Sequence, residues 1–377
     1  MSFVTGSGLT RYGRHAGRGT LDLMTEATDL ALADGGFTRG DIDGLVCGYS
    51  TTLPHLMLST VFAEHYGLHP RYAHAVQLGG ATGFALVMLA HQLIASGAAR
   101  RVLVVGAENR MTGQSRDSSI QVLAQVGHPV YEVPLGATIP AYYGLVASRY
   151  LHEFGGTEAD LAEMAVLMRR HAALHEGAQF RAPISVQDVL ASRSIASPLK
   201  MLDCCPVSDG GCAFVVSATP EGAHPVRIRS ATQQHNAQHI SAAASLTNVG
   251  AGACAARALS EAGRGLAEVE YAAIYDSFTI TLTMLLEEIG LAPRGRAGAL
   301  AREGYFDATG ALPLNLHGGL LSYGHCGVGG AMAHLAETHL QMTGRAGARQ
   351  ARRAGVALLH GDGGVLSSHV SLVLESA

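Results

Sequence analysis

Short apolar segments alternate with longer amphipathic ones along the whole chain. Residues 20–35 place apolar side chains at helical spacing and predict a helix. Residues 42–48 form a short apolar run typical of a buried strand, and a second helix is expected near residues 56–66. Residues 72–80, YAHAVQLGG, predict another strand that ends on glycines. This alternation of strands and helices is typical of an α/β protein.

One order of elements occurs twice. Residues 79–109 and 324–364 each contain a glycine turn, a long apolar helix, a basic linker, a buried strand and a small or polar exit. Residues 42–50 and 271–279 match in the same way, each as a strand upstream of its glycine turn. The repetition predicts an internally duplicated protein with two βαβ-rich halves and roughly parallel strands.

The two halves are expected to be domains of residues 1–223 and 224–377. Residues 115–205 have no counterpart in the second half and contain two predicted helices, near 137–153 and 158–176. Because a long insertion over one face of a domain often shapes a binding site, we expect this segment to form the loop region over the active site.

The glycine-rich stretch 313–330, PLNLHGGLLSYGHCGVGG, contains six glycines, two histidines and one cysteine. Apolar residues at helical spacing follow it, so the stretch predicts a strand, a turn and a helix start. Glycines let backbone N–H groups approach a ligand, and a helix start adds unpaired donors and a positive dipole end. The stretch could therefore hold a developing negative charge. A tight turn in the core, with His325 merely hydrogen-bonded, is equally compatible with the pattern.

Composition narrows the possible functions. With 48% hydrophobic and 15% charged residues, the chain of 377 residues can bury two packed units. The net charge of −4 provides no basic stripe, so neither nucleic acid nor a membrane surface is an expected partner. The longest apolar region, 81–106, is interrupted by polar and charged residues and falls short of a membrane span. Six scattered cysteines and a start without an apolar signal core predict a reduced cytoplasmic protein.

Several further motifs indicate little chemistry. Gly6-Ser7-Gly8 lacks the third glycine of a dinucleotide loop, so nucleotide binding is not expected. The cysteines in the middle of the chain lack metal-pair spacing, and no metal site is predicted. The remaining candidates are structural cysteines (Cys204, Cys205, Cys212), a turn-forming Asp209, four histidines expected on the surface or satisfied in the core (His171, His175, His235, His239), and two residues that could line a site (His128, Tyr143).

The ordered motifs IDGLVCG, ARRVLVVGAEN, SPLKMLDCCPVSDGG, YDSFT, NLHGG, GHCGVGG and HGDGGVLSS together resemble the thiolase superfamily over essentially the whole chain. They are most similar to its sterol-carrier or lipid-transfer branch. The resemblance implies a five-layered αβαβα fold, a homodimer, and the making or breaking of a C–C bond next to a coenzyme A thioester. It implies an acyl-CoA substrate and no permanently bound cofactor.

The chain departs from that family at its catalytic positions. Gly80 stands where the family has its nucleophilic cysteine, so no thiolate can form there. The sequence Tyr275-Asp276-Ser277-Phe278 matches the family's Asn-Glu-Ala-Phe or His-Asp-Cys-Phe motif, and Gly324-His325-Cys326 matches its Gly-His-Pro motif. The family's last cysteine falls on either His360 or Gly361.

Without a nucleophile, retro-aldol cleavage of a β-hydroxyacyl-CoA fits the residues better than thioester exchange. The resemblance extends to steroid side-chain aldolases, which have this fold without the cysteine, depend on a tyrosine at the position of Tyr275, and associate with a small OB-fold zinc-ribbon protein. Those aldolases tend to have a second tyrosine where this chain has His325. The candidate catalytic residues are Tyr275, His325, Cys326 and His360, and the candidate substrate-binding residues are Gly80, Asp276, Tyr323, Gly324 and Gly363.

In this hypothesis Tyr275 takes the hydroxyl proton, while His325 and the backbone of residues 324–330 bind the enolate oxygen. The site would have to lower the pKa of Tyr275, for example through a protonated His325. Two alternatives remain. One is a thiolase with unusual residues, in which Cys326 is a displaced nucleophile whose pKa the helix start lowers. The other is a non-catalytic acyl-CoA or lipid carrier subunit.

Overall fold

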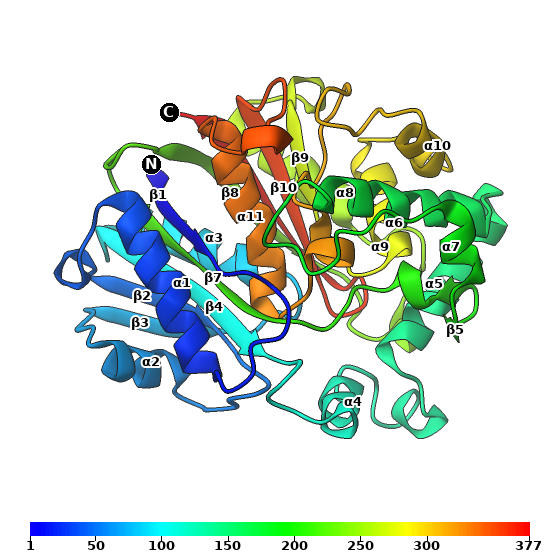
Figure 1. Ribbon diagram of the computed structural model, residues 1–377, viewed down its shortest axis with the longest axis horizontal. Helices are drawn as coiled ribbons and strands as arrows, with labels where there is room; N and C mark the ends of the chain where they lie inside the picture. The colour runs from blue at the N-terminus through cyan, green and yellow to red at the C-terminus, as the bar shows by residue number, and fades with distance from the viewer.

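The computed structural model describes all 377 residues and places nine strands in one sheet, in the order β3-β2-β4-β7-β1-β8-β11-β10-β9 (Figure 1). The strands are β1 (Ser2–Leu9), β2 (Gly44–Gly48), β3 (Tyr72–Val76), β4 (Arg101–Asn109), β7 (Asp209–Ser217), β8 (Val226–His235), β9 (Tyr271–Ile274), β10 (Val356–Gly363) and β11 (Ser368–Ser376). A separate pair consists of β5 (Ser194–Ala196) and β6 (Leu199–Lys200).

The strand order confirms the duplication. Read from one edge, the first half runs β3-β2-β4-β7-β1, and read from the other edge, the second half runs β9-β10-β11-β8. A parallel bridge from Leu314 to Ala272 of β9 takes the place of β3 in the second half. The two halves meet where β1 pairs with β8, and the boundary expected at residues 223 and 224 lies in the connection between β7 and β8.

The expectation of roughly parallel strands is only partly right, because the sheet is mixed. The pairs β2–β3, β2–β4 and β9–β10 are parallel, whereas all other pairs of the large sheet are antiparallel. A short turn after Gly363 joins β10 to β11 and can only reverse the chain, while parallel neighbours need a crossover that includes a helix.

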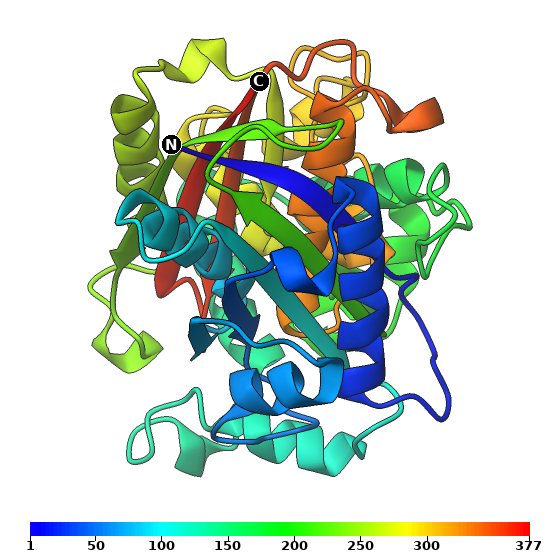
Figure 2. The same ribbon diagram turned by 90° about the vertical axis from the view of Figure 1, so that its left-hand side faces the viewer.

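The strands of each half count as one β-layer, and helices between and outside these two layers complete the five. The central layer contains α3 (Thr82–Ala95) and α11 (Val328–Met342), which contact strands of both halves and one another. Both are buried on most sides, as expected for helices with few charged residues. The outer layers contain α1 (Thr20–Gly35) and α2 (Leu58–Tyr66) on the first half, which Figure 2 shows in front of the sheet, and α8 (Ala251–Ala262) and α9 (Thr279–Ile289) on the second half.

The insertion forms four helices at one end of the molecule. They are α4 (Arg116–Ala124), α5 (Ile139–Phe154), α6 (Glu158–Ala172) and α7 (Val186–Ala191), and the short α10 (Ala297–Arg302) packs against α6. Helices α5 and α6 confirm the two that the sequence predicts. Helix α4 was not predicted, because it buries no residue and therefore has no apolar stripe to read.

The glycine-rich stretch differs from its prediction. Instead of a strand, it contributes two isolated bridging residues, Leu314 and His325, with a π-helical turn at Gly319–Tyr323 between them. Helix α11 follows as expected. None of the helices combines the length and apolar character that a membrane crossing requires.

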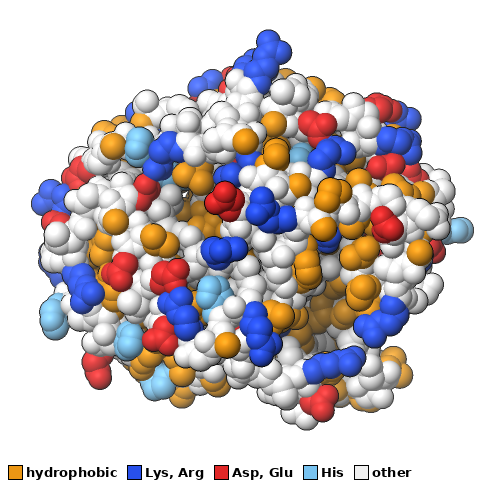
Figure 3. Space-filling model, viewed as in Figure 1, with side chains coloured by type: hydrophobic (Ala, Val, Ile, Leu, Met, Phe, Trp, Pro, Cys, Tyr) orange, Lys and Arg blue, Asp and Glu red, His pale blue; other side chains and the backbone are white.

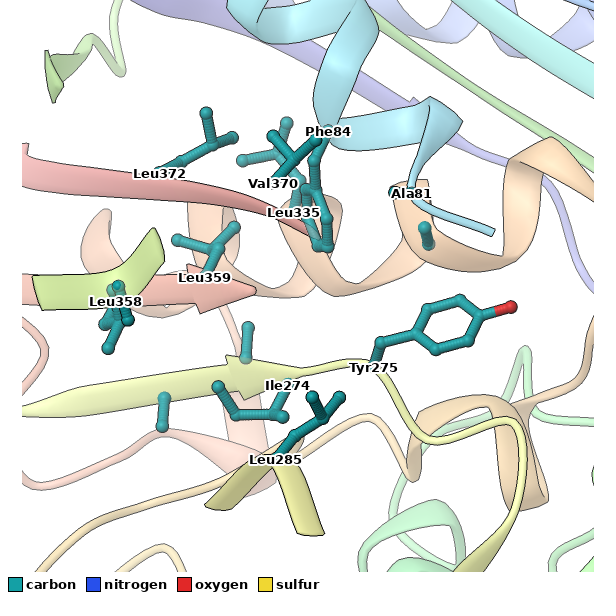
Figure 4. Packing of buried hydrophobic residues seen from close by; sticks show 14 of the residues in the cluster. Ala81, Phe84, Ile274, Tyr275, Leu285, Leu335, Leu358, Leu359, Val370 and Leu372 are labelled. Carbon is teal, nitrogen blue, oxygen red and sulfur yellow. The ribbon is translucent and has the colours of Figure 1, made fainter. Parts of the chain in front are cut away.

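A large apolar core joins the central helices to the second half-sheet. Figure 4 shows Phe84 of α3 and Leu335 of α11 packed against Leu359 of β10 and Val370 of β11. Tyr275 lies at one edge of this core, with its ring near Ala81 and its hydroxyl directed away from the aliphatic side chains. The core therefore fixes the tyrosine ring and leaves its oxygen at the start of α3.

Candidate active site

Tyr275 and His325 form a hydrogen-bonded pair between the two halves' glycine turns. Tyr275 follows β9, and its backbone N–H donates to the carbonyl oxygen of His360 at 2.9 Å. Its hydroxyl oxygen lies 3.1 Å from Nε2 of His325, and the two rings are nearly perpendicular at 88°. The structure thus brings together the two residues on which the sequence hypothesis rests.

The hydrogen bond at Nδ1 of His325 shows which of its two ring nitrogens carries the proton. The backbone N–H of Gly327 donates to Nδ1 at 3.1 Å, so Nδ1 carries no proton. Burial, together with the charge of Arg110, lowers the pKa of His325 to about 3, and the ring is neutral near neutral pH. A neutral ring with a free Nδ1 has its proton on Nε2. His325 therefore donates to the oxygen of Tyr275, which leaves the phenol proton free to point at a ligand.

A chain of backbone contacts holds His325 in place. Its N–H donates to Oγ of Ser208 at 2.9 Å, and its carbonyl oxygen accepts from the N–H of Ser208 at 3.1 Å. Gly324, just before it, approaches the same hydroxyl so closely that an added Cβ would lie 2.4 Å from it. A larger residue at position 324 would push His325 out of line with Tyr275.

Asp276 has a different place from the one expected for a substrate-binding residue. Its fully buried carboxylate accepts from the backbone N–H groups of Leu320 at 2.7 Å and Leu321 at 3.3 Å, and Nε2 of His334 lies 3.2 Å away. Gly319 fits only because it lacks a Cβ, which would lie 1.9 Å from this carboxylate. Asp276 thus anchors the π-helical turn that leads to His325.

Gly80 lies directly against the hydroxyl of Tyr275. A Cβ atom built on Gly80 would lie 2.2 Å from that oxygen and 2.5 Å from the carbonyl oxygen of Asp362. Both distances are far below van der Waals contact. A cysteine at position 80 and a tyrosine at position 275 therefore exclude one another, and the tyrosine hydroxyl lies beside the position of the missing side chain.

The expectation that the site lowers the pKa of Tyr275 is wrong. Burial raises its pKa well above the ordinary value, and the nearby Cys205 and Asp362 act in the same direction. The cation that was expected to oppose these effects is absent, because His325 is neutral. Tyr275 is consequently a protonated phenol in the resting site.

Cys326 and Tyr323 belong to a separate cluster with Tyr12 on the far side of the His325 segment. The hydroxyl of Tyr323 donates to the carbonyl oxygen of Thr10 at 3.1 Å, and its ring packs edge-on against Tyr12. Burial raises the pKa of Cys326 to about 12, so the expected lowering by the helix start is wrong. The structure does not bring either residue to the tyrosine–histidine pair.

His360 also points away from the pair. Its Nδ1 lies 2.8 Å from Oγ of Ser371 and its Nε2 lies 3.1 Å from Nδ1 of His369, in a fully buried group beneath α8. Neighbouring residues of a strand face opposite sides, and Gly361 faces Phe84 and Ala81 of α3. Of the two residues that could match the family's last cysteine, the one on the side of α3 is the glycine.

One residue near the pair, Asp362, was not among the residues predicted from the sequence. Asp362 lies two positions after His360 on β10 and interacts with Tyr143 of α5, a residue considered only as a possible wall of the site. Gly363 packs under the loop before Gly80, where an added Cβ would lie 2.2 Å from the carbonyl oxygen of Leu78. The place of Asp362 inside the motif HGDGGVLSS was the available signal.

A cleft of about 710 Å³ opens beside the pair, between α4, the start of α5 and β5. Figure 3 shows a hollow with apolar walls and basic side chains at its rim above α4. Arg110, Arg116 and Arg193 line the cleft, together with Val207, which pairs with His325. The buried Nε of Arg110 has no hydrogen-bond partner, and Glu108 lies 3.6 Å from it.

The remaining candidates have structural contacts. Asp209 accepts from the N–H groups of Met111 at 2.7 Å, Thr112 at 3.1 Å and His15 at 2.9 Å, and so fixes the loop that carries Arg110. His128 packs against Tyr131 and His239. Gly6-Ser7-Gly8 lies inside β1, all six cysteines are free, and no group of three or more His, Cys, Asp or Glu side chains is arranged to hold a metal ion.

Comparison with known proteins places this geometry in a family. Residues 3–219 match the model "Thiolase, N-terminal domain" and residues 232–376 match "Thiolase C-terminal domain-like". A steroid side-chain-cleaving aldolase of Thermomonospora curvata is 31% identical, covering 84% of this chain and 85% of that protein. An acetyl-CoA acetyltransferase of Methanothermobacter thermautotrophicus is 28% identical over 97% of this chain and 98% of that protein.

Solved structures agree with the sequence matches. The structure titled "Ltp2-ChsH2(DUF35) aldolase" is 29% identical, covers 100% of this chain and 97% of that chain, and has a TM-score of 0.87. Human mitochondrial 3-ketoacyl-CoA thiolase, at 13% identity and a TM-score of 0.76 over 100% of this chain and 99% of that chain, shares the fold. The chain, with its five layers, its duplicated halves and its glycine in place of the nucleophile, belongs to the thiolase family.

Proposed function

We propose that this protein is a carbon–carbon lyase that cleaves a β-hydroxyacyl-CoA by a retro-aldol reaction, without a covalent acyl-enzyme. The observation that carries the proposal is the Tyr275 hydroxyl beside Gly80, at the place where a thiolase would present its thiolate. A thioester exchange needs a nucleophile to hold the acyl group, whereas a retro-aldol cleavage needs only proton transfer and stabilisation of an enolate.

The proposed reaction begins at the substrate's β-hydroxyl group. Its proton moves to the phenolate oxygen of Tyr275, the β-carbonyl forms, and the electron pair of the breaking C–C bond moves into the thioester enolate. The Nε2–H of His325 stabilises the phenolate, a different role from the binding of the enolate oxygen that the sequence suggested. Because burial keeps Tyr275 protonated at rest, only a small phenolate fraction is active in the cleavage direction.

The proposed substrate is a CoA thioester bound in the cleft beside the pair. Phosphate groups favour arginine, and three arginines line this cleft, while its walls include apolar side chains such as Ile120 and Leu123. The similarity to steroid side-chain-cleaving aldolases supports a bulky steroid-like acyl group.

We further propose a homodimer in the cytoplasm that binds a small partner protein carrying an OB-fold and a zinc ribbon. Strand β3 is the sheet edge and has only one neighbour, and Leu56 and Leu135 are 98% and 81% exposed. The free cysteines suit a reducing compartment. Light scattering after size-exclusion chromatography tests the dimer, and full activity and solubility of the isolated chain would contradict the need for a partner.

The experiment that tests the lyase activity uses a panel of steroid-like and aromatic β-hydroxyacyl-CoA thioesters. We expect a free carbonyl product and a shortened acyl-CoA in equal amounts, and no added acyl mass on the intact protein. An acyl adduct on Cys326 would overturn the proposal in favour of a thiolase. Binding of the thioesters without turnover, even with the partner present, would overturn it in favour of a carrier subunit.

A further inference from the structure

A retro-aldol cleavage leaves one proton transfer that Tyr275 and His325 do not explain. After the C–C bond breaks, the α-carbon of the enolate must gain a proton to become the product acyl-CoA. Gly361, the residue on the α3 side at the family's last cysteine position, carries no acid, and both nitrogens of the His360 imidazole are engaged by Ser371 and His369. The site therefore needs a second proton carrier.

Tyr143 and Asp362 form a buried pair with the required chemistry. The Tyr143 hydroxyl oxygen lies 2.9 Å from Oδ2 of Asp362 and 3.3 Å from the carbonyl oxygen of Gly364. The two side chains are 2% and 1% exposed, and Oδ1 of Asp362 has no hydrogen-bond partner. Burial raises the pKa of Asp362 well above its usual range, so the carboxyl group retains its proton at a pH where an exposed aspartate has lost it.

The pair adjoins the tyrosine–histidine pair. The carbonyl oxygen of Asp362 and the hydroxyl of Tyr275 both lie within 2.5 Å of the point where a Gly80 Cβ would stand. The ring of Tyr143 stacks on Phe278, three residues after Tyr275, with centroids 4.4 Å apart. The main chain of Asp362 thus adjoins the Tyr275 hydroxyl at the start of α3, and its carboxyl group is close enough to act on the pKa of Tyr275.

Helix α5 connects this pair to the cleft. Ile139 lines the cleft, and Tyr143 follows four residues later on the same face of α5. An acyl-CoA that enters along this face meets Ile139 first and the Tyr143 hydroxyl one helical turn further in.

We propose that Tyr143 and Asp362 are the second proton-transfer pair of the site, with Tyr143 as the donor to the α-carbon and Asp362 as its proton store; this inference rests on the proposed lyase function. With the proton of Asp362 on Oδ2, Asp362 donates to the Tyr143 oxygen, and the Tyr143 O–H is free to point at the α-carbon. The Tyr143 O–H bond breaks as the α-C–H bond forms, and the electron pair of the enolate becomes that bond. The proton of Asp362 then moves to the Tyr143 oxygen. Tyr275 now holds the substrate's hydroxyl proton and Asp362 is a carboxylate. Return of one proton from Tyr275 to Asp362 restores both pairs, with no net proton change.

The test follows the reverse proton transfer on a product-like thioester, in which the carboxylate form of Asp362 takes the Tyr143 proton as the Tyr143 oxygen takes one from the α-carbon. Propionyl-CoA in D₂O is the probe, because its α-carbon carries two distinguishable hydrogens. We expect the wild-type protein to exchange one of them stereospecifically, measured by mass spectrometry and NMR. Tyr143→Phe and Asp362→Asn should each slow the exchange at least about 100-fold, the size expected for loss of an acid–base group.

A matched control lies on the same helix. Tyr150 is also buried, and its hydroxyl donates to both carboxylate oxygens of Glu287 at 2.8 Å. Tyr150→Phe removes an equivalent tyrosine–carboxylate contact away from the site and should leave the exchange rate at the wild-type level. Thermal melting of all variants identifies any that is misfolded, and Tyr143→Phe, which keeps the ring stack on Phe278, is the variant that decides.

Two results would overturn the inference: wild-type protein that exchanges neither hydrogen, or Tyr143→Phe that exchanges as fast and as stereospecifically as wild type. Failure of the proposed function is distinguishable, because it would appear as absent cleavage of β-hydroxyacyl-CoA or as an acyl adduct. Tyr275→Phe separates the steps further, since it should lose cleavage and keep the exchange.

Discussion

The two glycine turns of the duplicated halves differ in what they contribute to the site. The turn before α3 provides no reactive side chain, and its essential property is the open space at Gly80. The turn before α11 retains His325, held by Ser208 and by the N–H of Gly327. The second half also supplies Tyr275, whose hydroxyl lies against the first turn. In this protein the first half leaves open space at Gly80, and the second half carries the reactive side chains of Tyr275 and His325.

The largest loss of kcat should come from removing the Tyr275 hydroxyl, which lies against Gly80 in the turn before α3. We expect Tyr275→Phe to lower kcat by about 10²- to 10⁴-fold with little change in substrate binding, because the base is lost and the ring remains. Steady-state kinetics measures this. Tyr271→Phe, a buried tyrosine on the same strand, is the control, and an active Tyr275→Phe would refute the assignment of the base.

The second-largest loss of kcat should come from removing the imidazole of His325, in the turn before α11. His325→Ala removes the Nε2–H that donates to the phenol oxygen, and we expect a loss of about 10²- to 10³-fold in kcat. His339→Gln, another buried histidine of the α11 segment, should keep kcat and shows whether burial alone matters. A wild-type rate in His325→Ala would mean that the second turn acts only through its backbone.

The space in the first turn can be filled by a single methyl group. Gly80→Ala should displace the Tyr275 hydroxyl and lower kcat by roughly 10²-fold, as expected for a catalytic group misplaced by about 1 Å. At Gly40 an added Cβ meets nothing nearer than 3.8 Å, so Gly40→Ala is the control. In a double-mutant cycle, Gly80→Ala should cost little once Tyr275 is phenylalanine; equal costs in both backgrounds would show that the two positions are independent.

The pH dependence tests the protonation states of the pair. Because the pKa of Tyr275 is raised, the phenolate fraction grows with pH, and kcat/KM for cleavage should rise about tenfold per pH unit through the neutral range. His325, with a pKa near 3, stays neutral throughout and adds no inflection. A pH–rate profile from pH 6 to 9 measures this, and an inflection near pH 6.5 would assign His325 an ordinary pKa.

The smallest effect is expected at the cysteine beside His325. Cys326→Ala should keep kcat within about twofold and lower the free energy of unfolding by about 1 kcal/mol, because the buried thiol packs with Tyr12 and Tyr323. Kinetics and denaturant unfolding measure both quantities. A loss of activity comparable to that of Tyr275→Phe would reinstate Cys326 as a nucleophile.

The sequence predicted the elements that are strongly periodic or repeated. Helices α3 and α11 and the strands that follow them were evident from apolar spacing, and the motif order led to Tyr275 and His325. The face of β10 was not predictable, because a shift of one residue between His360 and Gly361 exchanges the two sides of a strand. The π-helical turn at Gly319–Tyr323 was missed because it depends on the distant carboxylate of Asp276.

Other parts of the site had no local signal. Tyr143 and Asp362 are 219 positions apart, and only the folded chain brings them together. Arg110 comes directly after the motif ARRVLVVGAEN but belongs to no motif itself, and its place beside His325 depends on Asp209 holding the loop. The direction of each pKa shift was equally hidden, since burial, the largest cause for both Tyr275 and His325, is a property of the fold.

The contact between Gly80 and Tyr275 also constrains how this sequence can change over generations. A return to cysteine at position 80 would collide with the tyrosine, and replacement of the tyrosine alone would leave a site with neither base nor nucleophile. Each single substitution is harmful, whereas both together would leave room for a thiol at position 80. We therefore expect positions 80 and 275 to change together among related sequences.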